Sequence, residues 1–249
     1  MIRVFIAPEA VSGGVLRLTG ADARHVGGAL RMRVGEPLVA VTPDGIEHRC
    51  TVTAASASEV LAEVIETGPS RSEPRLRVRL GQALLKGDQF DRILESSAEV
   101  GVDSVQPLLT ERAIARLDPG KAAAKLDRWR QIVRQGAELG QRARLPEVLD
   151  PASLAEAVGR AAADGMRSFL LYEGISLPSL SHVDYDSEGG VALMVGPEGG
   201  WSEAEVRLAE QAGALPVTLG PRIMRPLPAA LTALAVVLHR AGELELKEE

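Results

Sequence analysis

The chain has 249 residues and a formal net charge of −6, with 45% hydrophobic and 25% charged residues. These values are typical of a globular protein that can bury a substantial core, and the length suggests one or two domains. A single cysteine, Cys50, excludes an internal disulfide bond and a cysteine-rich zinc site. No apolar run reaches the length of a membrane span, so we expect a cytoplasmic protein with no membrane partner.

The first 70 residues are typical of a small all-β domain. Their β-branched residues and partial alternation predict strands, and Asp44-Gly45 between two of them predicts a hairpin. A short helix is expected over 22–30. Closure into a small barrel is natural for such strands, because it removes exposed edges. The strands are expected at 3–6, 15–20, 37–43, 48–55 and 60–67.

Residues 68–74 are polar, contain two prolines and lack apolar periodicity, which predicts a linker between domains 1–70 and 75–249. After the linker, strand and helix patterns alternate, and this predicts a mostly parallel sheet covered by helices on both faces. Strands are expected at 76–84, 105–109, 168–172, 191–195 and 215–219, and helices at 88–101, 121–140, 154–163, 202–212 and 229–241.

Three of these strands end in unusual loops, at 173–174, 196–202 and 220–226. Ligands of open α/β sheets bind at the carboxyl ends of strands. The middle loop has three glycines in five residues, which lets a backbone approach a ligand closely. It contains neither a Gly-Lys-Ser/Thr phosphate loop nor a G-x-G-x-x-G pattern. The residues alone therefore favour a ligand-binding loop over a structural turn and leave the ligand open.

Other catalytic and metal patterns are weak. The four histidines lack metal-ligand spacing, so no metal is expected. No Gly-x-Ser-x-Gly elbow occurs, and Cys50 in an apolar strand is better explained as a buried thiol than as a nucleophile.

The negative net charge counts against a simple attraction of the whole surface to nucleic acid. Residues 121–146 nevertheless hold seven basic and two acidic side chains, which fits a local RNA contact or a solvated helix face. The candidate RNA-binding residues are Arg24, Arg31, Arg33, Arg128, Arg134, Arg142 and Arg144.

The segments MVGPEGGWSEAEV and LGPRIMR, followed by an Ala/Leu-rich final helix, resemble the SPOUT class of RNA methyltransferases. ALLKGDQFDRILESSAEVGVDSVQPLLTERA, KLDRWRQIVRQGAELGQRARLPEV and HVGGALRMRVGEPL narrow the resemblance to the RsmE family. The similarity runs in order over nearly the whole chain, which makes it more specific than any single motif.

The resemblance implies a PUA-like β-barrel followed by an α/β domain with a deep trefoil knot, an exception to unknotted topology. It also implies a homodimer that uses S-adenosylmethionine to methylate N3 of one uridine in 16S ribosomal RNA, free or in the 30S particle. The three loops would form the cofactor pocket. Its expected residues are Leu171, Tyr172, Glu173, Gly174, Val195, Gly196, Pro197, Gly199, Gly200, Leu219, Gly220, Ile223, Met224, Arg225 and Ala229.

One stretch departs from the family pattern. Where the family usually has Thr-Glu-Thr-Ala, this chain has Pro226-Leu227-Pro228-Ala229. Proline is tolerated in the first turn of a helix, so the fold should form. Leu227 removes the carboxylate that often stands there, which leaves Arg225 and Glu198 as the candidate catalytic residues. Arg225 would stabilise negative charge on the uracil oxygens.

Three alternatives remain open at this point. The chain could be a SPOUT methyltransferase for another RNA, or a non-catalytic RNA-binding assembly factor, which the two prolines would favour. It could also be an enzyme that binds a nucleotide phosphate on the loop at 196–200. The apolar positions Leu231, Leu234, Ala235, Val237 and Leu238 would let the final helix bury more than one face, as a dimer requires.

Overall fold

The computed structural model describes residues 1–174, 176–185 and 188–245. Contacts divide the chain into two compact units, which we call the N-terminal unit and the sheet unit. The N-terminal unit comprises Met1–Glu73 with Ala137–Leu145, and the sheet unit comprises Pro74–Gly136 with Pro146–Glu249. The segment Ala137–Leu145 therefore belongs by its contacts to the N-terminal unit, whereas the sequence placed it in the second domain.

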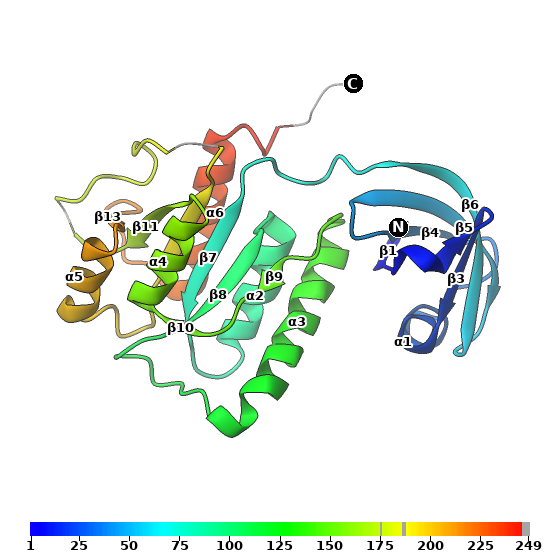
Figure 1. Ribbon diagram of the computed structural model, residues 1–249, viewed down its shortest axis with the longest axis horizontal. Helices are drawn as coiled ribbons and strands as arrows, with labels where there is room; N and C mark the ends of the chain where they lie inside the picture. Colours follow the sequence, from blue (N-terminus) through cyan, green and yellow to red (C-terminus); the bar gives the residue numbers. More distant parts are fainter. Residues whose placement is uncertain (175, 186–187, 246–249) are drawn as a thin grey trace. The chain divides into compact units, whose positions relative to one another are not determined.

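The N-terminal unit is built on one mixed sheet in the order β1-β4-β5-β6-β3-β2 (Figure 1). β1 is parallel to β4, and the other pairs are antiparallel. The predicted hairpin is confirmed, because Gly45 takes a φ of 80° in the turn that joins β4 to β5. The elements are β1 (Ile2–Phe5), the 3₁₀ turn η1 (Pro8–Ala10), β2 (Val11–Ser12), β3 (Val15–Thr19), β4 (Pro37–Val41), β5 (Ile46–Ala55) and β6 (Glu59–Pro69).

The helix expected near residue 22 is present in an altered form. α1 (Gly20–Ala23) is short and continues directly into a π-helical turn, η2 (Arg24–Ala29). Gly27 allows this turn to reach the sheet, because a Cβ there would lie 2.1 Å from the Ser56 carbonyl oxygen. The thiol of Cys50 is buried in the core below, as expected, and burial raises its pKa to about 11.

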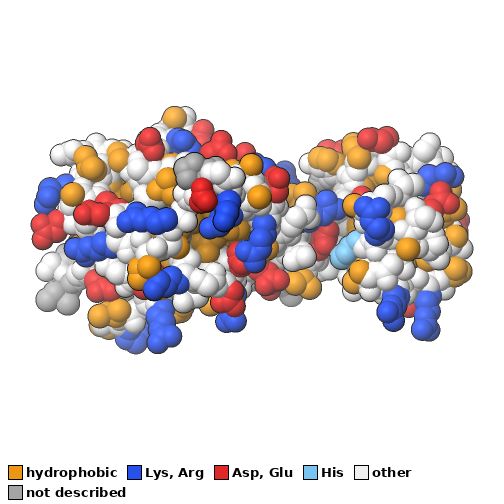
Figure 2. All heavy atoms as spheres, turned by 90° about the horizontal axis from the view of Figure 1, so that it is seen from below, with side chains coloured by type: hydrophobic (Ala, Val, Ile, Leu, Met, Phe, Trp, Pro, Cys, Tyr) orange, Lys and Arg blue, Asp and Glu red, His pale blue; other side chains and the backbone are white. Residues whose placement is uncertain are grey.

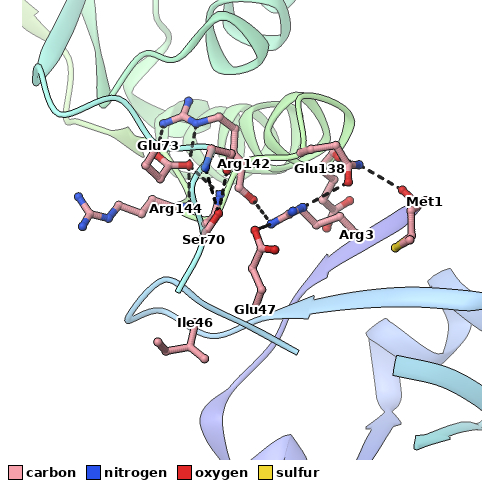
Figure 3. A network of polar contacts seen from close by, with 12 residues as sticks. Met1, Arg3, Ile46, Glu47, Ser70, Glu73, Glu138, Arg142 and Arg144 are labelled. Carbon is pink, nitrogen blue, oxygen red and sulfur yellow. Dashed lines mark hydrogen bonds and ion pairs between the residues drawn. The ribbon is translucent and has the colours of Figure 1, made fainter. Parts of the chain in front are cut away.

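Polar contacts hold the segment Ala137–Leu145 within the N-terminal unit (Figure 3). The Glu73 carboxylate accepts hydrogen bonds from Arg142 Nη2 at 2.7 Å and from the backbone N–H of Ala143 at 2.7 Å. Arg3 donates to the carbonyl oxygen of Arg142 at 3.1 Å and pairs with Glu47 at 2.8 Å. A small apolar cluster completes the attachment and consists of Phe5, Val39, Val41, Ala137 and Ala143.

The sheet unit contains a parallel sheet in the order β10-β8-β7-β12-β11-β13, with β9 beside β8. The parallel sheet expected from the alternating pattern is thus confirmed (Figure 1). β12 matches its expected range, because an unbroken apolar run defines it, whereas β13 ends two residues early. The strands are β7 (Val78–Ala83), β8 (Ser104–Leu109), β9 (Glu147–Val148), β10 (Ala152–Ser153), β11 (Arg167–Leu171), β12 (Val191–Val195) and β13 (Leu215–Val217).

Helices cover both faces of this sheet. α2 and α6 contribute to the core on one face, and α4 and α5 to the core on the other. α3 packs on α2 through Trp129 and Phe90, whose ring centroids are 4.8 Å apart. The helices are α2 (Gln89–Val100), α3 (Ala122–Leu139) after the 3₁₀ turn η3 (Pro119–Lys121), α4 (Leu154–Ala163), α5 (Glu203–Gln211) and α6 (Pro226–Arg240).

α6 begins three residues before the expected Ala229, with Arg225 as its N-cap residue and Pro226 in the first turn. The expectation that the two prolines are compatible with the helix is confirmed. Residues 180–185 lie against this helix, because Tyr185 Oη donates to the Val237 carbonyl oxygen at 2.8 Å. Arg240 donates to the carbonyl oxygens of Leu180 and Val183 at 3.1 and 2.6 Å.

Within the part of the chain that the structure describes, no helix combines the length and apolar character that crossing a membrane requires. The same residues contain no group of three or more His, Cys, Asp or Glu side chains placed to hold a metal ion.

Candidate active site

The three glycine-containing loops lie at one edge of the parallel sheet. β12, β11 and β13 are consecutive neighbours, and all run in the same direction. The loops that follow them, at 172–174, 196–202 and 218–225, therefore start from adjacent strand ends. This edge is where open parallel sheets bind ligands.

Trp201 joins the glycine loop after β12 to the end of β11. Its indole Nε1 donates to the Leu171 carbonyl oxygen at 3.0 Å, and the side chain is almost fully buried. The ring packs on Gly196, where a Cβ would lie 3.1 Å from the indole. Gly200 has a φ of 68° and donates to the Pro197 carbonyl oxygen at 2.9 Å, which closes the turn. Glycine is thus needed at 196 for space and at 200 for conformation.

α5 begins at the end of this loop with a capping box. Ser202 Oγ accepts from the Glu205 N–H at 3.2 Å, and Glu205 Oε2 accepts from the Ser202 N–H at 2.9 Å. The second oxygen, Glu205 Oε1, accepts from the backbone N–H of Glu111 at 2.8 Å. The same carboxylate thus fixes both the start of α5 and a loop after β8.

The loop after β8 (110–118) is a fourth element of the site, which the sequence analysis did not identify. Arg112 Nη1 donates to the Gly199 carbonyl oxygen at 3.4 Å. A Cβ on Gly199 would lie 3.3 Å from Arg112 Cβ, so the two backbones approach closely. The signal that could have found this loop was its position, because it follows a parallel strand at the same sheet edge as the glycine loops.

The third loop is shaped by Gly220, whose φ is 104°. Thr218 Oγ1 accepts from the Gly220 N–H at 3.2 Å, and its hydroxyl donates to the Gly220 carbonyl oxygen at 3.1 Å. At the other end of the loop, the Ala229 N–H donates to the Arg225 carbonyl oxygen at 3.0 Å. Both ends of the loop are therefore defined by local hydrogen bonds.

The expected cofactor residues separate into an apolar wall and an exposed rim. Val195, Pro197 and Ala229 are buried, while Leu171, Leu219 and Met224 are partly buried against the main core. Tyr172, Gly196, Gly200 and Gly220 are also partly buried. The rim consists of Glu173, Gly174, Glu198, Gly199, Ile223 and Arg225. Ile223 is 79% exposed, and both candidate catalytic side chains, on Glu198 and Arg225, face solvent.

Two buried side-chain oxygens near this edge have no hydrogen-bond partner among the described residues. They are Gln82 Oε1 near the end of β7 and Thr110 Oγ1 just after β8. Gln82 is fully buried and lies opposite Val195, the residue before the glycine loop. An unsatisfied buried oxygen costs about 1–3 kcal/mol, so such groups are more common at functional sites than in ordinary cores.

The candidate RNA-binding arginines have different environments. Arg24, Arg31, Arg33 and Arg144 are exposed in the N-terminal unit. In the sheet unit, Arg128 is exposed and pairs with Asp91 at 2.6 Å, and Arg134 is partly buried. On the face shown in Figure 2, Lys and Arg side chains are interspersed with Asp and Glu and form no continuous basic stripe.

Arg142 is the exception, and the expectation for it was wrong. It is 3% exposed and pairs with Glu73 at 2.7 Å, so its guanidinium is not available to a phosphate. A buried guanidinium requires such a partner, and Glu73 lies far away in the sequence.

A hollow of about 420 Å³ lies elsewhere in the sheet unit, where Arg79, Arg160 and Asp164 are among the lining residues. Arg79 donates to Asp164 at 2.7 Å, and Arg160 donates to the Asp150 carbonyl oxygen at 3.1 Å. Arg79 is the second residue of β7 and Asp164 is the C-cap residue of α4, so this hollow is at the amino edge of the sheet. Because these lining charges already have partners, it is a poor candidate for the active site.

Comparisons with known proteins identify relatives of this chain. The RNA methyltransferase domain family matches residues 72–238, and the RNA methyltransferase PUA domain family matches residues 18–65. Ribosomal RNA small subunit methyltransferase E of Bacillus subtilis is 32% identical over 230 residues, which cover 90% of this chain and 89% of that protein. The Synechocystis protein of the same name is also 32% identical and covers 94% of this chain and 76% of its own length.

The chain is also similar to solved structures of methyltransferases. Ribosomal RNA small subunit methyltransferase E from Neisseria gonorrhoeae, crystallised with S-adenosyl methionine, superposes with a TM-score of 0.85 at 31% identity. That comparison covers 96% of this chain and 98% of the other. A methyltransferase from Legionella pneumophila, solved with bound SAM, has a TM-score of 0.85 at 32% identity and covers 96% of this chain and 97% of that one.

The expected fold class, a SPOUT domain preceded by a PUA-like domain, is confirmed by these comparisons. The loops at the carboxyl edge of the parallel sheet thus occur in a chain that resembles these enzymes over nearly its full length. The chain belongs to the ribosomal RNA small subunit methyltransferase E family of RNA methyltransferases.

Proposed function

We propose that this protein transfers a methyl group from S-adenosylmethionine to N3 of a uridine in small-subunit ribosomal RNA, free or in the 30S particle. The observation that carries the proposal is the 32% identity to Bacillus subtilis methyltransferase E over 90% of the chain. The reaction would take place in the cytoplasm, where ribosomal RNA is found.

The residues at the carboxyl edge of the sheet fit this cofactor. Gly200 and Gly220 have open space where a Cβ would stand, which suits a ligand held through peptide groups, whereas Gly196 and Gly199 give room to Trp201 and Arg112. Leu171, Leu219 and Met224 offer apolar surface to an adenine ring. The unsatisfied Gln82 oxygen beside the base of the loop gives the site a buried acceptor for a ligand N–H group. When bound, the cofactor would supply the electrophilic methyl group.

The protein must then align the uracil nitrogen with that methyl group and handle its proton. Positioning of this kind can lower a barrier by about 7–11 kcal/mol in favourable cases. Arg225 is exposed at the N-cap of α6, where its guanidinium can stabilise negative charge on the uracil oxygens. Glu198 is exposed on the glycine loop and is the remaining carboxylate candidate for accepting the N3 proton.

The stretch Pro226-Leu227-Pro228 supports a second candidate function, a non-catalytic RNA-binding assembly factor. It contributes no hydroxyl or carboxylate to the rim, and Leu227 is partly buried against the core. Because α6 starts normally at Pro226, the loss concerns side-chain chemistry and not the fold. A methyltransferase acting on another RNA is the second enzyme candidate.

We also propose a homodimer formed through the sheet unit. Leu234, Val237 and Leu238 are fully buried within the monomer, so they cannot form the interface. Leu231, Ala235 and the neighbouring Val236 remain partly exposed on α6, and Ile223 is 79% exposed on the loop before it. A contiguous patch of such side chains would mark an interaction surface.

The proposal is tested by mass spectrometry of nucleosides from small-subunit RNA incubated with the purified protein and S-adenosylmethionine. We expect 3-methyluridine at one position in RNA from cells that lack the gene. Calorimetry with S-adenosylmethionine, S-adenosylhomocysteine and ATP accompanies the assay. Cofactor binding without any methylated nucleoside would support the assembly factor, a different methylated nucleoside would support another RNA target, and binding of ATP alone would contradict the cofactor assignment.

A further inference from the structure

The loop after β8 is fixed in place by contacts on both sides of Arg112. On one side, the Glu111 N–H donates to Glu205 Oε1 at 2.8 Å. On the other side, Ala113 is 4% exposed and anchors the chain in the core. Arg116 donates to the carbonyl oxygens of Thr110 and Glu111, at 3.4 and 3.3 Å, and closes the loop on itself.

Arg112 differs in its environment from the arginines of the sheet unit that form ion pairs. Arg79, Arg92, Arg128 and Arg207 each lie within 4.0 Å of a carboxylate oxygen. Among the residues that the structure describes, no carboxylate lies within ion-pair distance of Arg112. Its guanidinium contacts the Gly199 carbonyl oxygen, and the side chain is exposed. The cation is therefore held in place while its charge remains available to a ligand.

The position of this cation relates it to the reaction. Gly199 lies in the loop proposed to hold the cofactor, and its carbonyl oxygen accepts from Arg112 Nη1 at 3.4 Å. The target nucleotide must reach the methyl group at this edge of the sheet, so its phosphates pass near the rim of the loop. An arginine is suited to such a position, since its planar group can contact two phosphate oxygens at once.

We propose that Arg112 binds a phosphate of the RNA strand next to the target nucleotide and thereby positions that nucleotide over the glycine loop. This inference rests on the proposed function for the identity of the substrate. It assigns Arg112 to RNA binding and positioning, and it assigns no step of proton or methyl transfer to it. Because the fixed loop presents the guanidinium in advance, little conformational freedom is lost on binding.

The test compares Arg112→Gln with Arg207→Gln. Arg207 is exposed on α5 and pairs only with Glu203 of the same helix at 3.4 Å, so its replacement changes the net charge equally without touching the loop. RNA affinity is measured by fluorescence anisotropy over a series of salt concentrations. Cofactor affinity is measured by calorimetry, and kcat and KM are measured by methyl transfer.

We expect Arg112→Gln to raise the Kd and KM for RNA by about five- to tenfold and to reduce the salt slope by about one unit, with cofactor affinity unchanged. Arg112→Lys should keep the salt slope, because it keeps the charge. Arg207→Gln should leave all these quantities unchanged. The binding measurements need no turnover, so they remain decisive even if the wild-type protein transfers no methyl group.

Three results would overturn the inference. Equal losses of RNA affinity in Arg112→Gln and Arg207→Gln would show a general effect of net charge. A fall in kcat with unchanged RNA affinity would assign Arg112 to the reacting base instead of a phosphate. A loss of cofactor affinity in both Arg112→Gln and Arg112→Lys would show that the side chain only supports the glycine loop.

Discussion

Glu73 and Arg142 illustrate how one side chain acquires its role from a distant partner. Glu73 accepts hydrogen bonds from Arg142 and from the backbone N–H groups of Ala143 and Arg144 (Figure 3). Burial alone would raise the pKa of Glu73, but these hydrogen bonds outweigh it and hold the pKa below its ordinary value. The carboxylate therefore stabilises the N-terminal unit in its ionised form.

We expect Glu73→Gln to destabilise the N-terminal unit by about 3 kcal/mol at neutral pH, because it leaves a buried guanidinium without its counter-charge. A carboxyl group whose pKa is depressed on folding contributes its full stability above the unfolded pKa of about 4.3, and the contribution is lost as the pH falls through the folded value. The difference between variant and wild type should thus shrink below about pH 4.

Amide hydrogen exchange at Ala143 and Arg144 measures this effect within the unit. Both tryptophans, Trp129 and Trp201, belong to the sheet unit, so their fluorescence serves as the internal reference. If the difference in exchange protection between Glu73→Gln and wild type stays constant from pH 7 to pH 3, the role of the ionised carboxylate is contradicted.

Gly199 offers a graded test of the glycine loop. A Cβ there would lie 3.3 Å from Arg112 Cβ and 3.4 Å from the Arg112 carbonyl oxygen, so alanine requires a small shift and valine a larger one. We expect Gly199→Ala to weaken S-adenosylmethionine binding and Gly199→Val to abolish it, while both proteins stay folded. Gly159→Val on α4, where a Cβ meets open space, is the control. Calorimetric affinity that is undiminished in Gly199→Val would remove the loop from the cofactor site.

Two capping boxes, one at the start of α4 and one at the start of α5, allow a matched comparison. Ser153 with Glu156 caps α4, and Ser202 with Glu205 caps α5. Both satisfy N–H groups of a first helical turn, but only Glu205 also accepts from the loop after β8. Loss of the box at α4 should therefore lower only the stability of the protein. Loss of the box at α5 should lower the stability and also disturb the candidate active site.

We expect Ser153→Ala and Ser202→Ala each to lower the free energy of unfolding by about 1 kcal/mol. Only Ser202→Ala should also weaken cofactor binding, because the N-cap residue directly follows the glycine loop and Trp201. Chemical denaturation and calorimetry measure the two effects. Equal cofactor affinity in both variants would mean that the position of α5 does not matter to the loop.

Elements that carry their own local signals could be predicted from the sequence. α4 and β12 have the expected bounds, the first because a capping box marks its start and the second because an apolar run marks its length. The glycine loops could be predicted because several glycines directly after a parallel strand have few explanations other than a ligand-binding loop. Gly200 and Gly220 do take the positive φ values that only glycine adopts easily.

Features that depend on tertiary partners could not be predicted. β9 and β10 have two residues each, and their strand character comes only from pairing with β8. Arg142 appeared to be part of a basic surface, because nothing near it in the sequence reveals Glu73. The loop after β8 lacks glycine and any motif, so its place beside Gly199 follows only from the order of strands in the sheet.

The proposed homodimer predicts the mass of the protein in solution. The partly exposed residues of α6 and the exposed Ile223 are the apolar candidates for its interface. We expect light scattering to give twice the mass of 26.4 kDa at micromolar concentration. Ile223→Asp should shift the equilibrium toward the monomer, whereas Ile65→Asp, at a side chain that is 64% exposed in the N-terminal unit, should not. A wild-type monomer would contradict the proposal outright.

Because the net charge is −6, the affinity of the protein for RNA must come from local basic groups. Arg31 and Arg33 are exposed near the π-helical turn of the N-terminal unit, and Arg31 has a positive φ of 55°. Asparagine tolerates that conformation, so Arg31→Asn with Arg33→Gln removes two charges without added strain.

We expect this double variant to bind small-subunit RNA more weakly and to lose about one to two units of salt slope, because two phosphate contacts disappear. Cofactor affinity should be unchanged, since the glycine loops belong to the sheet unit. The control, Arg17→Gln with Arg49→Gln, removes equal charge from the same unit at exposed arginines that pair with Glu59 and Glu66. If both variants lose RNA affinity equally, net charge governs binding. If neither loses affinity, the remaining exposed candidates, Arg24, Arg128 and Arg144, become the residues to test next.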